Sequence, residues 1–374
     1  SGLGGGGGGS VGGGTGSGGT ASSVAYDRRN KAYNIREFFK GGGDDPGRIR
    51  DGYFFFYTDS TGRSYLLLGQ GQHEDNSRND GWWKYTIEDS LGGQAGTLDS
   101  FESLGQGGGA QAYHSPGVLY KNKFMFLGGV LGNNYYNQVW GVSFGSTISS
   151  SSLVRTTEIS SDTDMPSERY GAVGAVNDNI WYIFGGRLAN NNHSAALFYI
   201  NLDDYSDRGE ITPSNGVYPT ARRGAQLGYY NNCLYLYGGA GGSTFTDLFW
   251  KFDLTTNNWE QITLITINGD VPQIGWAGKF VGNSNVVGNE MYIVYGHMYN
   301  GKTSGFYYPN DKNPWIYTIN LDTYEWTKLD APSLIGMSLG ASYDYAAEQV
   351  CCGWYKNKLY CYGGYKDAIV KQAF

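Results

Sequence analysis

One short phrase recurs along the chain and limits the folds available to it. It reads YLLLGQ at 65–70, FMFLGG at 124–129, WYIFGG at 181–186, LYLYGG at 234–239, YIVYGH at 292–297 and LYCYGG at 359–364. The first glycines of these copies are 59, 57, 53, 58 and 67 residues apart. Copies at such regular spacing indicate a repeat architecture, in which each copy belongs to one supersecondary unit.

Each copy of the phrase predicts a buried strand followed by its exit turn. Four apolar or aromatic residues in a row are typical of a strand that is crowded on both faces. The two glycines allow the chain to turn where a Cβ atom would clash. The rest of each interval adds further short strands, as in ARRGAQLGYYNN, CLYLYGG, DLFWKFDLTTN and NWEQIT between 221 and 263. The repeat unit is therefore four short strands separated by turns.

The composition agrees with an all-β protein that has many turns. The chain of 374 residues contains 60 Gly, 32 Tyr and 10 Trp, and 16% of its residues are charged, against about 25% in an average protein. The net charge of −7 comes without a basic stripe, so we expect no nucleic-acid partner. No apolar run approaches the length of about 20 residues that spans a bilayer, so we expect no membrane-spanning segment.

Several motifs in these units resemble the kelch repeat. They are the starts Arg169-Tyr170-Gly171 and Arg222-Arg223-Gly224, the β-run that ends in Gly-Gly, and a Trp near the end of the unit, at Trp259 and Trp326. The resemblance covers about residues 50–374, and the period is slightly longer than the kelch period of about 50 residues. It implies a β-propeller in which each repeat forms one blade and closure of the ring protects the strand edges.

We therefore predict one six-bladed kelch-type propeller of four-stranded blades at residues 26–374. The expected blades are about 48–105, 106–161, 166–214, 220–265, 274–331 and 341–374. Few residues follow the last Gly-Gly, so we expect the last blade to lack its outer strand. We expect the segment NKAYNIREFF, about 30–39, to supply that strand and join the two ends of the chain.

Residues 1–25 form a Gly/Ser-rich N-terminal arm. Alone, such a segment is a flexible linker, and ordering it costs about 1–2 kcal/mol per residue. Glycine backbone can nevertheless approach a surface closely and use main-chain hydrogen bonds. We interpret the arm as an assembly device that docks on a neighbouring subunit, with Gly2, Leu3 and Val11 among its contacts. The alternative is packing on its own propeller.

The sequence offers little for catalysis. The four histidines are His73, His114, His193 and His297, and no HExxH, phosphate-binding loop or Gly-x-Ser-x-Gly motif is present. The galactose oxidases resemble kelch propellers and hold copper with two Tyr and two His, one Tyr being linked to a Cys. This chain lacks a clear pair of histidines at matching strand positions. We predict no enzyme activity, cofactor, catalytic residue or metal site, and keep a copper oxidase as a distant alternative.

A long loop in the fifth copy, HMYNGKTSGFYYPNDKNP at 297–314, favours a binding function. Aromatic residues at a loop tip suit the recognition of proteins or sugars, although they can also pack back on the blade. The expected binding residues are His297, Tyr299, Phe306, Tyr307 and Tyr308, with Trp82 and Trp83 of the first copy at the same rim.

Two further features bear on the compartment. Cys352 and Cys361 would face each other in a hairpin that turns near 356–357, which predicts a cross-strand disulfide and an oxidising environment; small buried thiols are the alternative. Asn192-His193-Ser194 is an N-glycosylation sequon in an expected loop. Together with Ser at position 1 instead of Met, these features favour a processed, extracellular or cell-surface protein.

The sequence thus predicts a non-catalytic structural or interaction subunit of a larger assembly. Its expected partners are copies of itself or other protein subunits, and glycans are further candidates. The alternative function is a carbohydrate-binding propeller that uses the aromatic loop. This conclusion rests mainly on fold-level analogy.

Overall fold

The computed structural model describes most of the propeller region. The described residues are 49–73, 81–87, 102–106, 114–145 without 132, 148–149, 153–294 without 163, 243, 269–270 and 272–273, 296–298, 316–329, 350–355, 358–362, 365–366 and 368–369. The predicted arm (1–25), the closing strand (30–39) and most of the long aromatic loop (297–314) lie outside these residues.

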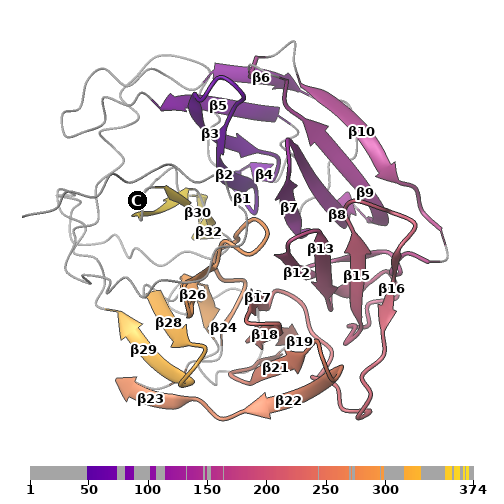
Figure 1. Cartoon of the computed structure of the whole chain (residues 1–374), viewed down its shortest axis with the longest axis vertical. Helices are drawn as coiled ribbons and strands as arrows, with labels where there is room; N and C mark the ends of the chain where they lie inside the picture. The colour runs from indigo at the N-terminus through magenta and orange to yellow at the C-terminus, as the bar shows by residue number, and fades with distance from the viewer. Residues whose placement is uncertain are drawn as a thin grey trace, which may run out of the picture.

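Five blades, each built on four antiparallel strands, are arranged around a centre (Figure 1). Further short strands extend the sheets of blades 2 and 5. From the innermost strand outward, blade 1 is β2 (Tyr53–Thr58), β3 (Ser64–Gly69), β5 (Gly81–Ile87) and β6 (Glu102–Gln106); blade 2 is β7 (Gly117–Tyr120), β8 (Lys123–Leu131), β9 (Asn134–Ser143) and β10 (Val154–Ile159); blade 3 is β12 (Val173–Asn177), β13 (Ile180–Phe184), β15 (Leu197–Asn201) and β16 (Arg208–Ile211). Blade 4 is β17 (Gln226–Tyr230), β18 (Cys233–Tyr237), β21 (Phe249–Asp253) and β22 (Asn258–Ile262); blade 5 is β25 (Val286–Val287), β26 (Glu290–Val294), β28 (Ile316–Asn320) and β29 (Glu325–Leu329).

The repeated phrase forms the second strand of each blade. In blade 4, all five residues of β18 are buried, and the exit glycines Gly238 and Gly239 have φ of +67° and +93°. A Cβ at Gly238 would lie 2.3 Å from the carbonyl oxygen of Ile274 in blade 5. The phrase therefore ends in glycine because the next blade lies directly against the turn.

The prediction of six four-stranded blades is met only in part, because the described residues contain five. The expected sixth blade is represented by a hairpin of β30 (Cys351–Tyr355) and β31 (Lys358–Tyr362). This hairpin lies against blade 1, where the Tyr355 and Phe56 rings stack with centroids 4.9 Å apart. Lys279 of blade 5 pairs with Cys351 in a parallel bridge. The hairpin therefore stands between blades 5 and 1.

Blade 5 carries a fifth strand at its outer edge. The segment β23 (Ile265–Asn268) follows blade 4 in sequence and pairs in parallel with β29. The remaining short strands join the loops between blades: β1 (Ile49–Arg50) with β4 (Gln72–His73), β11 (Arg169–Tyr170) with β14 (Arg187–Leu188), β19 (Ala240–Gly241) with β20 (Thr244–Phe245), β24 (Ile274–Gly275) with β27 (His297–Met298), and β32 (Tyr365–Lys366) with β33 (Ala368–Ile369). Among the described residues, no helix is long and apolar enough to cross a membrane.

Candidate functional site

The innermost strands surround the centre of the ring (Figure 1). A cavity that opens to solvent is lined by the residues at the start of these strands. Its volume is about 70 Å³, which is room for several water molecules. Residues of all five described blades line it, from Asp51 in blade 1 and His114 in blade 2 to Trp276 and Lys279 in blade 5. A cavity at the centre of a propeller is a natural place for a binding site, because every blade contributes to its wall.

In each blade, one of the residues that precede the innermost strand has left-handed backbone geometry. These residues are Asp51, His114, Gly171, Gly224 and Trp276, with φ between +55° and +70°. From blade 2 onward they are joined in series, since each backbone N–H donates to the carbonyl of the previous one: Gly171 to His114 at 2.5 Å, Gly224 to Gly171 at 2.8 Å and Trp276 to Gly224 at 2.9 Å. We call these five residues the left-handed ring.

Glycine is the residue expected at such positions, because a side chain raises the energy of left-handed backbone. Blades 3 and 4 meet this expectation, whereas blades 1, 2 and 5 carry Asp51, His114 and Trp276. A Cβ at Gly224 would lie 2.8 Å from the Trp276 ring, and one at Gly171 would lie 3.0 Å from it. The glycines thus leave the space that the Trp276 indole fills, and non-glycine residues in this conformation tend to cluster at functional sites.

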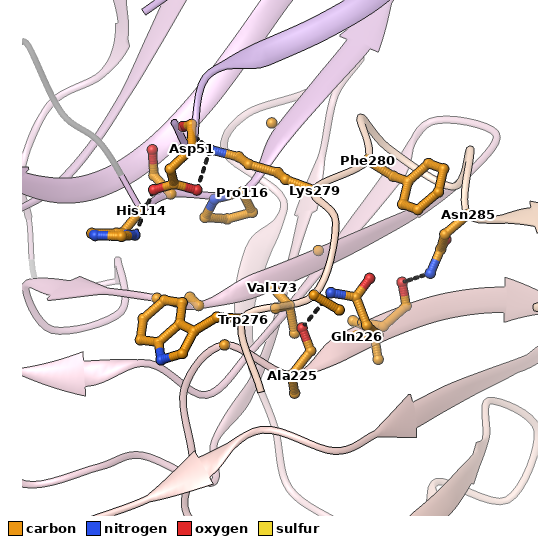
Figure 2. A pocket seen from close by; sticks show the side chains of 18 of the residues that line it. Asp51, His114, Pro116, Val173, Ala225, Gln226, Trp276, Lys279, Phe280 and Asn285 are labelled. Carbon is orange, nitrogen blue, oxygen red and sulfur yellow. Dashed lines mark hydrogen bonds and ion pairs between the residues drawn. The ribbon is translucent and has the colours of Figure 1, made fainter. Parts of the chain in front are cut away.

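Asp51, His114 and Lys279 form a largely buried group of ionisable side chains on the cavity wall (Figure 2). Asp51 Oδ2 lies 2.5 Å from His114 Nδ1, and Asp51 Oδ1 lies 3.4 Å from Lys279 Nζ. Lys279 Nζ also donates to the Asp51 carbonyl at 3.0 Å. Burial alone would raise the pKa of Asp51, but His114 and Lys279 outweigh it and hold that pKa at about 2. Burial lowers the pKa of Lys279.

A cluster of cationic and aromatic side chains adjoins this wall. We call Tyr170, Arg187, His193, Arg223 and Trp276 the mouth cluster. The Arg223 guanidinium lies 5.2 Å from the Tyr170 ring centroid and 5.3 Å from that of Trp276. The Trp276 ring in turn lies 5.0 Å from that of His114. Guanidinium groups stack favourably on aromatic faces, so Arg223 is held between two rings.

Both arginines of the mouth cluster donate to one oxygen. Arg187 Nη1 donates to the Tyr170 hydroxyl at 3.0 Å, and Arg223 Nη1 donates to the same hydroxyl. Burial and the nearby Arg187 lower the pKa of Arg223. Burial also lowers the pKa of His193, together with the charges of Arg223 and Arg187. The cluster therefore places two arginine charges close together on a chain whose net charge is −7.

The two kelch-like arginines next to the cluster have another role. Arg169 Nη1 donates to the Gly185 carbonyl at 2.7 Å, and Arg222 Nη1 donates to the Gly238 carbonyl at 3.0 Å. In both cases the acceptor is the first glycine of the repeated phrase. These arginines are buried, and burial lowers the pKa of each to about 10. They fasten the start of a blade to its own Gly-Gly turn.

The structure places the residues expected at a binding rim in different surroundings. Trp82 is fully buried in blade 1 and pairs with Gly69 across the strands, where its ring occupies the space that a Gly69 Cβ would need. It is a packing residue, and Trp83 is half-buried. His297 lies in β27, and Tyr299, Phe306, Tyr307 and Tyr308 lie outside the described residues.

The remaining sequence candidates are partly described. Cys352 and Cys361 lie directly opposite in β30–β31, as free buried thiols with Sγ atoms 3.3 Å apart. Asn192 is exposed in a turn. Gly2, Leu3 and Val11 fall outside the described residues. Among the residues that are described, no group of three or more His, Cys, Asp or Glu could hold a metal ion.

The sequence reasoning missed the residues that surround the cavity. Arg223 was read only as part of an Arg-Arg-Gly motif, and Trp276 and Lys279 were not singled out. A signal was present, because IGWAGK at 274–279 and AYHSPG at 112–117 stand where other units have Arg-x-Gly. The residues that replace that glycine are the ones that face the cavity.

The architecture and these motifs define a kelch-type β-propeller. The family model described as the KLHDC2/KLHL20/DRC7 Kelch-repeats domain matches residues 118–364, more than half of the chain. The chain therefore belongs to the kelch-repeat family. It is similar to Kelch domain-containing protein 10 of Bos taurus and of Homo sapiens, with 24% identity over 165 residues in each case. The match covers 44% of this chain and 33% of the length of either relative.

Proposed function

We propose that this chain is a non-catalytic interaction subunit whose mouth cluster binds an acidic segment of a partner protein. Kelch propellers are generally protein-interaction scaffolds, which supports the class of function. The observation that carries the chemistry is the convergence of Arg187 and Arg223 on the Tyr170 hydroxyl. Arginine forms its strongest hydrogen bonds with anionic oxygens, and a neutral phenol is a weaker acceptor than a carboxylate.

The electrostatic setting supports the same ligand. Arg187 and Arg223 repel each other at a half-buried site, and this repulsion adds to burial in lowering the pKa of Arg223. The two arginine charges and burial also lower the pKa of His193, which favours its neutral form. A carboxylate would relieve this repulsion. A local positive site on an acidic protein also attracts acidic ligands selectively and speeds their association.

The assembly part of the proposal concerns the ends of the chain. We propose that β30–β31 belongs to a sixth blade, which residues 30–39 complete, and that the arm at 1–25 docks on a neighbouring subunit. The place of the hairpin between blades 5 and 1 supports a further blade there. The exposed Asn192 in a turn is accessible for glycosylation, in keeping with an extracellular or cell-surface protein.

Calorimetry with two capped peptides, octaglutamate and octalysine, tests the site. Octaglutamate should bind, more weakly as salt is added, and octalysine should not. Either Arg187→Met or Arg223→Met should weaken binding about tenfold, the value of one charge-assisted hydrogen bond. The matched control is Arg63→Met, which changes an exposed arginine in the β2–β3 turn. Equal binding of both peptides, or an equal loss in the control, would refute the proposal.

A further inference from the structure

Blade 5 departs from its neighbours between the left-handed ring and its second strand. The interval is nine positions in blades 2, 3 and 4, from His114 to Lys123, Gly171 to Ile180 and Gly224 to Cys233, but fourteen in blade 5, from Trp276 to Glu290. Blade 1 also has a long interval, which lengthens the β2–β3 hairpin. In blade 5 the innermost strand is instead reduced to the two residues of β25. The additional residues must therefore lie elsewhere.

These residues cross the centre of the ring, where Figure 1 shows the loop that follows β24. The Gly282 N–H donates to the Gly117 carbonyl of blade 2 at 2.8 Å, and a Gly282 Cβ would lie 3.1 Å from Val176 of blade 3. Val281 is buried in the core shared by blades 1 and 2. We call residues 277–285 the plug.

Side chains fasten the plug to blade 4 as a strand would. Asn283 Nδ2 donates to the Tyr229 carbonyl at 2.8 Å, and the Tyr229 N–H donates back to Asn283 Oδ1 at 2.5 Å. Asn285 Nδ2 donates to the Leu227 carbonyl at 3.1 Å (Figure 2). Two asparagines thus satisfy backbone groups on the inner edge of β17, and no strand among the described residues pairs with that edge.

Lys279 of the plug connects it to the cavity wall and to the hairpin. Its ammonium group lies over the Tyr53 ring at 3.9 Å and bonds to Asp51 of blade 1. Its backbone bonds to β30 and its neighbour, since the Lys279 N–H donates to Val350 at 2.7 Å and the Cys352 N–H donates to Lys279 at 2.8 Å. One residue therefore joins blade 5, the hairpin and blade 1.

We infer that the plug closes one end of the central channel, and that Lys279 is a positioning residue for the mouth cluster. Lys279 fixes Asp51, Asp51 fixes His114, and His114 lies against Trp276, which covers Arg223. Ligand binding at the mouth is then coupled to closure between blades 5 and 1. The coupling rests on the proposed function, whereas the plug itself does not.

Two measurements without ligand test the inference in the full chain. Amide hydrogen exchange in the plug, measured on a peptide that spans it, should be slow in the wild type, because hydrogen-bonded amides exchange only when the backbone opens locally. In Lys279→Met the exchange should be about tenfold faster. The His114 ring-proton signals, assigned with His114→Gln, should shift in Lys279→Met. The matched control is Lys121→Met, whose exposed ammonium pairs with Asp203; neither measurement should change there.

The octaglutamate affinity is the third measurement, and it should fall about fivefold in Lys279→Met, in keeping with couplings of 1–3 kcal/mol between sites. Asn283→Ala releases the plug from blade 4 without changing a charge. It replaces Lys279→Met in the hydrogen-exchange measurement if Lys279→Met does not fold. Unchanged exchange in the variant that folds would overturn the plug. Faster exchange with unchanged His114 signals would overturn the positioning role. Failure of octaglutamate to bind the wild-type chain would overturn the proposed function and the coupling. The plug would then be tested by the hydrogen-exchange measurement alone.

Discussion

Arg222 and Arg223 are adjacent in the chain but have different roles. Arg222 points into blade 4, where it bonds to the Gly238 carbonyl and to both the carbonyl and the hydroxyl of Thr220. Arg223 points to the mouth cluster and lies between two aromatic rings. A strand-like backbone sends successive side chains to opposite sides, so one dipeptide supplies both a structural bond and a recognition group.

Methionine at either position separates these roles. Arg222→Met leaves the buried Gly238 carbonyl without its donor and removes two bonds to the exposed Thr220, so we expect the free energy of unfolding to fall by about 1–3 kcal/mol. Arg223→Met removes a charge that Arg187 repels, so stability should change by less than about 1 kcal/mol while octaglutamate binding weakens. Urea denaturation of both variants measures the difference. Equal destabilisation would contradict the division of roles.

Asp51 makes stability depend on pH in a defined range. Its pKa of about 2 lies below the ordinary value of 3.8, so the folded state favours the ionised form. The contribution of ionised Asp51 to the free energy of unfolding is complete above pH 3.8 and is lost as the pH falls towards 2. The difference between the two pKa values corresponds to about 2 kcal/mol of this free energy.

Asp51→Asn isolates this contribution, because Asn tolerates left-handed backbone. The variant should be less stable than the wild type by about 2 kcal/mol at neutral pH. The gap should narrow when urea denaturation is repeated from pH 4 down to pH 2. A gap that stays constant over this range would show that the loss comes from packing and not from the ion pairs with His114 and Lys279.

At the scale of single elements, the hairpin β30–β31 holds a cysteine pair in register. Burial raises the pKa of Cys352 well above its ordinary value, so its reactive thiolate is scarce at neutral pH. The two sulfurs, 3.3 Å apart, need to approach to about 2 Å to form a disulfide. The geometry permits the bond, and burial makes its formation slow.

We expect a mild disulfide oxidant, such as oxidised glutathione, to link Cys352 and Cys361 slowly and at a rate that rises with pH. Mass spectrometry of peptides before and after reduction would identify the link. Because the bond closes a small loop, the expected gain in stability is about 2–3 kcal/mol or less. Cys233→Ser, far from the hairpin, serves as the control. Linkage of Cys351 instead of Cys352 would show that the hairpin adopts another register.

Elements whose signal is local were predictable from the sequence. The buried run before Gly-Gly became a strand in every described blade, because a continuous apolar run is what a crowded inner strand requires. The plug could not be found this way, since KFVGNSN at 279–285 looks like an ordinary turn. Its placement depends on acceptors in blades 2 and 4 that are distant in sequence. Trp276 was missed for a related reason, because its conformation is set by the adjoining blades.

At the scale of the whole molecule, the ring of blades distributes one binding site over the chain. Asp51 and Trp276 are far apart in sequence and line the same cavity, and blades 1 and 5 both contact the hairpin β30–β31. Any loss of closure between these blades should therefore disturb the mouth cluster as well as stability. If the ring failed to close, its unpaired strand edges would also be prone to pair with other chains.

Two N-terminal truncations test how the ends of the chain contribute. A chain lacking residues 1–25 should keep the unfolding midpoint of the full chain but not form the oligomers that we propose the arm mediates, because only the arm is removed. A chain lacking residues 1–40 would also lack the segment that we propose as the closing strand. We expect it to be less stable and prone to aggregate, since the proposed sixth blade would then expose strand edges. Analytical ultracentrifugation and thermal unfolding separate the two effects. If the full chain and the shorter truncation are identical monomers, the arm is no assembly device. If the longer truncation is as stable as the full chain, the ring closes without residues 30–39, and the hairpin with its Lys279 bridge is sufficient to hold blades 5 and 1 together.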